Sequence, residues 1–332
     1  MRNSILFSLL LLQLACTAQF NGPESVEYDP VGDRYFVSNT GSNAILQINS
    51  LGSTSTFLSG LSASPYGLEI QGDTLFACMG NGVRGFDLAN GAEVFNLSLN
   101  AGFPNGITSD GQYLYVTDFS AQKIFRVDVA ANAFTTWVAN TNGTPNGIVF
   151  DAMNNRLLVA FWGSNAAVKA YNRSTASLVG TLNTNLTNID GIAVDCLGLI
   201  YVASWSPDRI SIIDDLLISV TGTWTNDVMN PADMDYDAVN GLLCIPNSGD
   251  NTVTFSALPE CTTAVGDVLP ATGRIHPVPS TGPVHLNGTQ RPSGTFRLLD
   301  LAGKEVLSGS WFRNEVLDLT GLDRGSYVMD LM

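Results

Sequence analysis

The feature that most constrains this chain is a phrase that recurs six times. Each copy holds a short strand with apolar residues at alternate positions, a turn of Gly, Asp or Asn, and a second strand rich in apolar and β-branched residues. Equivalent residues stand at positions 24, 66, 105, 146, 190 and 232, so successive copies are 42, 39, 41, 44 and 42 residues apart. A period of this length is typical of one four-stranded sheet per repeat. Because such sheets bury their faces only against their neighbours, the repeats predict an all-β fold, a six-bladed β-propeller.

One position within the phrase differs from copy to copy. The six residues found there are Glu24, Tyr66, Asn105, Asn146, Asp190 and Ala232. In a propeller the inner strands begin at the rim of a central channel, so these side chains should converge on its axis. Two carboxylates and two amide oxygens among them suit a hard divalent cation such as calcium. The Pro-Asn-Gly sequences around Asn105 and Asn146 are also favourable for a turn, and that alternative stays open.

Composition excludes several classes of function. The 332 residues are 45% hydrophobic and 14% charged, with a formal net charge of −15. An acidic chain without clusters of Lys and Arg is not suited to nucleic acid, whose phosphates require them. The two histidines, His276 and His285, follow the last repeat, which excludes Ser-His-Asp hydrolysis and histidine-ligated zinc or copper for the repeats. Any metal there must be held by oxygen.

Residues 1–18 have the layout of a secretory signal peptide. Arg2 precedes an apolar run from Ile5 to Leu12, and small residues precede the expected cleavage before Gln19. The run is too short to span a membrane, so we expect a secreted mature chain without a transmembrane segment. Lipidation at Cys16 is the alternative.

Four further cysteines would then lie in an oxidising compartment, where disulfides form. They are Cys78, Cys196, Cys244 and Cys261. Four cysteines allow three full pairings, and the sequence does not choose among them. For Cys78 and Cys244, which fall at or beside the ends of second strands, buried free thiols are expected.

The chain divides into a propeller and a smaller C-terminal domain. We expect the propeller over residues 19–261, with three clear strands in its last blade, and a linker of Thr, Gly, Ala and Pro over 262–273. Residues 274–332 alternate short strands with Gly and Pro, which predicts a small immunoglobulin-like β-sandwich.

Three phrases of this C-terminal segment, at residues 275–284, 296–306 and 317–328, resemble the sorting domain of the bacterial type IX secretion system. The resemblance implies the type IX secretion machinery as a partner. It also implies a secreted or cell-surface protein that crosses the periplasm and the outer membrane.

Residues 20 to 260 resemble the gluconolactonase/regucalcin family of six-bladed propellers. The resemblance rests on the run from Glu24 to Asp29, on Pro-Asn-Gly in the third and fourth copies, and on the run from Asp190 to Asp195. It implies that Glu24, Asn146 and Asp190 bind a divalent cation, calcium or else zinc, magnesium or manganese. It further implies that Asp190 is the catalytic base and that Asn105 contacts substrate or metal. Phe103 stands where regucalcin-like members carry an arginine that grips a sugar acid.

Aromatic and polar residues are expected on the same rim. We predict that Asn105, Phe103, Tyr66, Asp118, Trp162 and Trp205 contact the substrate, since aromatic faces beside a polar channel suit sugar rings or apolar ligands. Packing between adjacent blades is the alternative for the two tryptophans. The acids that recur at the ends of inner strands are predicted to shape hairpin turns; they are Asp29, Asp151, Asp195 and Asp237.

These features lead to two hypotheses. The first is a secreted metal-dependent hydrolase of the lactonase type, which acts on cyclic esters and takes a small lactone or a sugar-derived ligand. The alternative is a non-catalytic secreted propeller whose rim binds a glycan or a protein, because propellers host both classes of function.

Overall fold

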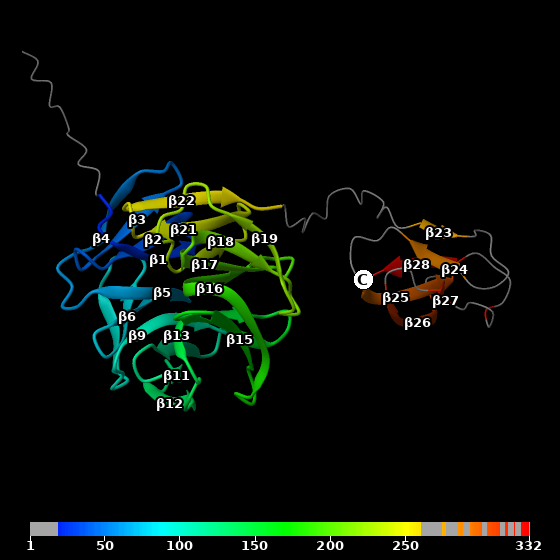
Figure 1. Ribbon diagram of the computed structural model, residues 1–332, viewed down its shortest axis with the longest axis horizontal. Coiled ribbons are helices and arrows are strands. Elements are labelled where there is room, and N and C mark those ends of the chain that lie inside the picture. Colours follow the sequence, from blue (N-terminus) through cyan, green and yellow to red (C-terminus); the bar gives the residue numbers. More distant parts are fainter. Residues whose placement is uncertain are drawn as a thin grey trace, which may run out of the picture. The chain divides into compact units, whose positions relative to one another are not determined.

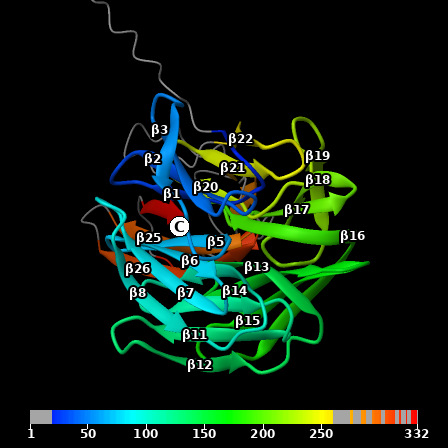
Figure 2. The ribbon, with the colours of Figure 1, turned by 90° about the vertical axis from the view of Figure 1, so that its left-hand side faces the viewer.

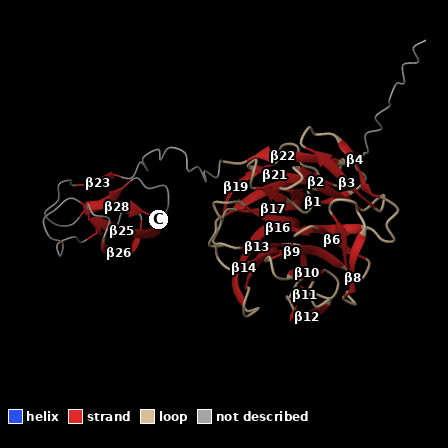
Figure 3. Cartoon of the chain, turned by 180° about the vertical axis from the view of Figure 1, so that it is seen from behind, coloured by secondary structure: helices blue, strands red, loops and turns tan. Residues whose placement is uncertain are grey.

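The computed structural model describes residues 19–259, 274–276, 284–287, 293–300, 304–312, 316–317, 322 and 327–331. The chain forms two compact units, Met1–Cys261 and Thr262–Met332. All regular structure in the described residues is β-strand, as predicted (Figures 1 and 3). The predicted signal peptide and linker lie outside the described residues.

The first three repeats each form a four-stranded antiparallel sheet in sequence order. The first contains β1 (Pro23–Asp29), β2 (Arg34–Asn39), β3 (Ala44–Asn49) and β4 (Thr54–Leu58). The second contains β5 (Pro65–Gln71), β6 (Thr74–Met79), β7 (Gly82–Asp87) and β8 (Glu93–Ser98). The third contains β9 (Pro104–Ser109), β10 (Leu114–Asp118), β11 (Lys123–Asp128) and β12 (Ala133–Val138).

The fourth and fifth repeats share one strand. The outer strand of the fourth continues without a break into the inner strand of the fifth, so both belong to one seven-stranded sheet. Its strands are β13 (Thr144–Asp151), β14 (Arg156–Trp162), β15 (Ala166–Asn172), β16 (Leu178–Val194), β17 (Ile200–Ser206), β18 (Asp208–Ile213) and β19 (Val220–Trp224). The sixth repeat has three strands in the described residues, as the sequence indicated: β20 (Asp235–Asp237), β21 (Leu242–Asn247) and β22 (Thr252–Ala257).

The core lies between adjacent blades. Phe36 and Ile45 of the first blade pack with Leu68 and Leu75 of the second, and the same kind of cluster recurs between the following blades. Each blade therefore buries its faces against its neighbours, which is the reason that repeats of this length form a propeller.

The first and last blades meet through their inner strands, which lie side by side in Figure 2. Ser25 and Asp233 form a parallel bridge. The Asp233 N–H donates to the Glu24 carbonyl at 2.8 Å, and the Tyr28 N–H donates to the Asp235 carboxylate at 2.9 Å. This contact brings acids of the last blade next to Glu24.

The repeated acids at the ends of inner strands shape hairpins, as predicted. Asp29 accepts the N–H groups of Val31 and Gly32, and the carboxylates of Asp151, Asp195 and Asp237 accept turn N–H groups in the same way. Arg34 pairs with Asp29 at 2.9 Å. The carboxylates of these four acids therefore serve to hold the hairpin turns.

In the C-terminal unit the structure describes two three-stranded sheets. One joins β23 (Arg274–His276), β24 (Val284–Asn287) and β27 (Val316–Leu317). The other joins β26 (Glu305–Phe312), β25 (Ser293–Asp300) and β28 (Tyr327–Leu331). The predicted sandwich remains a prediction.

Cys78 and Cys244 are buried free thiols, as expected, and Cys196 is disulfide-bonded. Every pairing that uses Cys78 or Cys244 is thereby excluded. Within the described part of the chain, no helix has the length and apolar character needed to cross a membrane.

Candidate functional site

The Pro-Asn-Gly sequences lie inside inner strands, so the turn alternative is wrong. Asn105 falls in β9 and Asn146 in β13, and neither has a positive φ. The glycine after each asparagine serves close packing. A Cβ atom on Gly106 would lie 2.5 Å from the carbonyl oxygen of Asn146, and one on Gly147 would lie 2.6 Å from that of Asp190. Adjacent inner strands thus approach each other closely at the channel.

This approach brings together the three residues predicted to bind a metal. The Asn146 side-chain amide donates to the Asp190 carboxylate at 2.7 Å. Burial, and then the neighbouring charges of Glu24 and Asp233, hold the pKa of Asp190 well above its ordinary value. Burial raises the pKa of Glu24 to about 7. The Glu24 carboxylate therefore lies close enough to Asp190 to disfavour the charge of Asp190.

The Asn146 amide has its oxygen left without a partner. Asn146 is 2% exposed, and its Oδ1 atom makes no hydrogen bond, while its amide nitrogen is bound to Asp190. A buried amide oxygen without a partner costs free energy, on the order of 1–3 kcal/mol. Such an atom beside two carboxylates is a ready ligand for a hard cation.

A further acid at this place was not predicted. After burial and the charge of Glu24, the charge of Asp233 also raises the pKa of Asp190, and the Ser25 hydroxyl donates to Asp233 at 3.4 Å. Burial, and then the charge of Glu24, hold the pKa of Asp233 well above its ordinary value. The sequence held a signal for it, because four copies of the phrase have glycine at this position and only Ser25 and Asp233 depart from that pattern.

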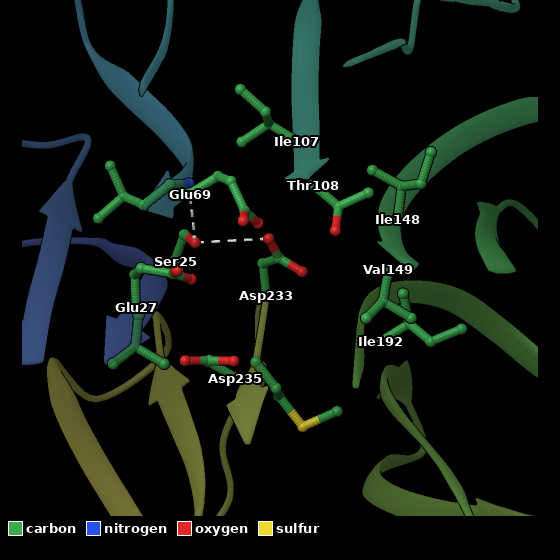
Figure 4. Close-up of a pocket in the computed structure, with 13 residues that line it drawn as sticks. Ser25, Glu27, Glu69, Ile107, Thr108, Ile148, Val149, Ile192, Asp233 and Asp235 are labelled. Carbon is green, nitrogen blue, oxygen red and sulfur yellow. Dashed lines mark hydrogen bonds between the residues drawn. The ribbon is translucent and has the colours of Figure 1, made fainter. Parts of the chain in front are cut away.

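Farther along the inner strands than these residues, the channel contains a small polar cavity of about 30 Å³, enough for one or two water molecules (Figure 4). Its polar lining comes from inner strands, and the carboxylates of Glu69 and Asp233 point toward each other in the close-up. The polar lining residues are Ser25, Glu27, Glu69, Thr108, Asp233 and Asp235.

The acids of the cavity are held toward their neutral forms. Burial, followed by the charges of Asp235 and Glu69, holds the pKa of Glu27 well above its ordinary value. Burial and the charge of Asp235 do the same for Glu69. Burial also raises the pKa of Asp235 to about 6.

The channel holds six acids in all, because Glu24, Asp190 and Asp233 add to these three. The described residues contain no group of three or more His, Cys, Asp or Glu side chains arranged to hold a metal, so a site here depends on amide oxygen.

The structure places Asp118 in a supporting position. It is 1% exposed, and its carboxylate accepts the N–H groups of Gly102, Phe103 and Ala121. Asn39 and Asn247, at the same place in other blades, likewise accept backbone N–H groups. Asp118 therefore fixes the loop that carries Phe103, and its hydrogen-bonding capacity is largely used for this.

The predicted aromatic residues lie in a chain of ring contacts. Tyr66 contacts Phe103, and Trp162 contacts Trp205, with ring centroids 4.7 and 5.0 Å apart. All four rings are half-buried. The Trp205 N–H donates to the Pro231 carbonyl at 3.1 Å. Asn105 is buried, at 6% exposure, at the start of β9.

The chain matches no family model and no curated protein sequence. Solved structures are similar to it in fold. A gluconolactonase from Xanthomonas campestris aligns over 73% of this chain and 87% of its own, with a TM-score of 0.62 and 16% identity. Hydrazine synthase from Kuenenia stuttgartiensis aligns over 75% and 99%, with a TM-score of 0.57 and 12% identity. A protein of unknown function from Bacteroides thetaiotaomicron aligns over 71% and 69%, with a TM-score of 0.56 and 13% identity. These similarities support the six-bladed propeller fold.

Proposed function

We propose that this protein is a secreted, metal-dependent hydrolase of the lactonase type, with its active site at the start of the inner strands. Glu24, Asn146 and Asp190 would hold one divalent cation, with calcium as the best match to an all-oxygen set. The fold similarity to a gluconolactonase is consistent with this proposal.

The observation that carries the proposal is the free Asn146 oxygen. The amide nitrogen binds Asp190, so the oxygen is left buried without a partner, next to the Asp190 carboxylate, whose pKa is raised by burial and then by the charge of Glu24. A cation bound by all three groups would satisfy the oxygen and offset the repulsion between the carboxylates. A single bound cation would thus relieve both the cost of the unpartnered oxygen and the cost of the repulsion between the carboxylates.

The residues would divide the chemistry of ester hydrolysis between them. A bound divalent cation supplies positive charge that polarises the ester carbonyl and lowers the pKa of water. Asp190 accepts the proton of the attacking water and returns it to the ring oxygen when the ring C–O bond breaks. Asn105 and the aromatic residues of the rim orient the lactone. The product is the open-chain hydroxy acid.

We also propose that the C-terminal unit directs export. The resemblance of its three phrases to type IX sorting domains supports this proposal, as does its separation from the propeller as a compact unit. The type IX secretion machinery would be its partner, and the propeller would reach the cell surface or the medium.

Hydrolysis of a panel of lactones by the full chain tests the proposed function. We expect ring opening that a chelator abolishes and that added calcium restores. Asp190→Asn should lose at least about 100-fold in kcat, and Asn105→Ala should lose less, because only Asp190 both holds the ion and accepts the proton. A calcium-loaded protein that opens no lactone would refute the lactonase and favour a propeller that only binds a partner.

A further inference from the structure

Five aromatic side chains form a continuous series on the rim of the channel. We call the series the aromatic arc, and it draws on blades two to five. Successive ring centroids lie 4.7, 5.4, 6.0 and 5.0 Å apart, with interplanar angles from 60° to 80°. These are edge-to-face contacts, so each ring supports the next. The members, in order, are Tyr66, Phe103, Phe119, Trp162 and Trp205.

Both ends of the aromatic arc adjoin the carboxylates of the candidate site. Tyr66 lies on β5, which packs beside β1, the strand that carries Glu24. Burial, and then the charge of Glu24, raise the pKa of the Tyr66 phenol. At the other end, Trp205 lies on β17 directly after Ser204, which pairs with Ile189, the residue before Asp190 on β16. A ligand whose reacting group lies between Glu24 and Asp190 therefore has the rest of its structure beside the arc.

The surface that the arc offers is apolar. All five rings are half-buried, so each keeps part of its area available. Phe103 and Phe119 carry no polar atom, and the Trp205 N–H already donates to the Pro231 carbonyl. Asp118, the acid that supports this part of the rim, accepts three backbone N–H groups. A sugar hydroxyl placed against the Phe103 or Phe119 ring would lose water without gaining a matching partner from that ring.

We infer that the aromatic arc binds an uncharged apolar substituent of the substrate, so that the substrate class is an alkyl-substituted lactone and not a polyhydroxylated sugar lactone. This inference rests on the proposed function for the position of the ester group. Each methylene removed from water against the rings should tighten binding, by roughly twofold to fourfold when well buried. A hydroxylated lactone presents less apolar area to the same rings and gains less from them.

The inference is tested by binding, separately from turnover. Isothermal titration of the calcium-loaded full chain with 2-alkylcyclopentanones, which have no ester bond to hydrolyse, should give dissociation constants that fall with alkyl length. Phe103→Ala should weaken the longest ketone roughly 10-fold. Phe134→Ala is the matched control, because Phe134 is also half-buried and edge-to-face with another ring, Phe125, but lies on the outer strand β12 of the same blade. It should leave the affinity unchanged.

Trp162→Ala provides a second variant in case Phe103→Ala does not fold. Affinity that is independent of alkyl length, or equal losses in Phe134→Ala and the arc variants, would overturn the inference. So would a KM for D-glucono-1,5-lactone lower than that for γ-nonalactone. Ketone binding with the expected chain-length dependence supports the arc even if no lactone is hydrolysed, in which case the proposed hydrolase alone fails.

Discussion

At the scale of single residues, the channel is built from departures from the repeat. Three positions of the phrase face the axis, and at each of them one or more blades carry an acid while the others carry an uncharged residue. The third position, three residues after the first, reads Glu27, Glu69, Thr108, Val149, Ala193 and Asp235. All three of its acids line the polar cavity. Since a repeat keeps what the fold needs, these departures indicate function.

The raised pKa values of these acids predict how stability depends on pH. Asp235 has a pKa of about 6 in the folded protein against an ordinary 3.8, so between these values the folded state binds more protons than the unfolded state. The free energy of unfolding then falls as pH rises through this range. Asp110 and Asp214, whose pKa values are lowered, act only at more acidic pH.

Without divalent cations, we expect the melting temperature to be lower at pH 8 than at pH 5, by roughly 5 °C. Glu69→Gln should reduce this difference, because the amide keeps the shape of the side chain and does not ionise. Glu93→Gln, which changes an exposed acid on β8, should not. Calorimetric melting of the wild type and both variants in the presence of a chelator, at pH 5 and at pH 8, tests this prediction. A melting temperature that rises from pH 5 to pH 8 would contradict the account.

At the scale of strands, sequence periodicity predicted most of the fold. The period, the short strands and the hairpin aspartates follow from local patterns, and the structure contains them. The continuity of β16 through two blades was not predicted, since the repeat pattern predicts a separate outer strand and inner strand for adjacent blades. The role of Gly106 and Gly147 was also missed. The sequence Pro-Asn-Gly does not distinguish a glycine needed for close strand packing from a glycine needed for a turn.

Of the site, the sequence predicted Glu24, Asn146 and Asp190, and the structure brings them together. It did not predict the other four acids of the channel, Glu27, Glu69, Asp233 and Asp235. Contacts between distant strands decide which acids share a channel, and a single strand does not reveal them. Asp118 shows the converse, because a polar residue at the rim turns out to have its carboxylate occupied by backbone N–H groups.

The close strand approach yields a prediction at this scale. Gly147→Ala would place a Cβ atom 2.6 Å from the Asp190 carbonyl oxygen, so β13 and β16 must separate. We expect a loss of about 1–3 kcal/mol in the free energy of unfolding, together with weaker calcium binding. Gly222→Ala is the control, because its Cβ would meet the side chain of Ile212 and no backbone atom among its nearest contacts, with the terminal Cδ1 nearest at 3.1 Å. Urea denaturation compares the two, and equal losses would refute the special role of Gly147.

At the scale of the whole propeller, the ring joins through inner strands of its first and last blades. The backbone bonds between Glu24, Val26 and Asp233 bring the two ends of the repeat array together at the channel. The buried hydrogen bond from the Tyr35 hydroxyl to Asp237, at 2.5 Å, supports the same junction. A site that uses Glu24 of blade one and Asp190 of blade five therefore exists only in the assembled ring.

Calcium titration of the chelator-treated full chain by isothermal calorimetry shows whether Glu24, Asn146 and Asp190 form one cation site. We predict one ion per chain, with affinity at least about 10-fold weaker in Glu24→Gln and in Asp190→Asn, because each loses a charged oxygen ligand. Glu93→Gln removes an exposed acid by the same chemical change and should bind as the wild type does. Absence of binding, or equal affinity in all four proteins, would contradict the account.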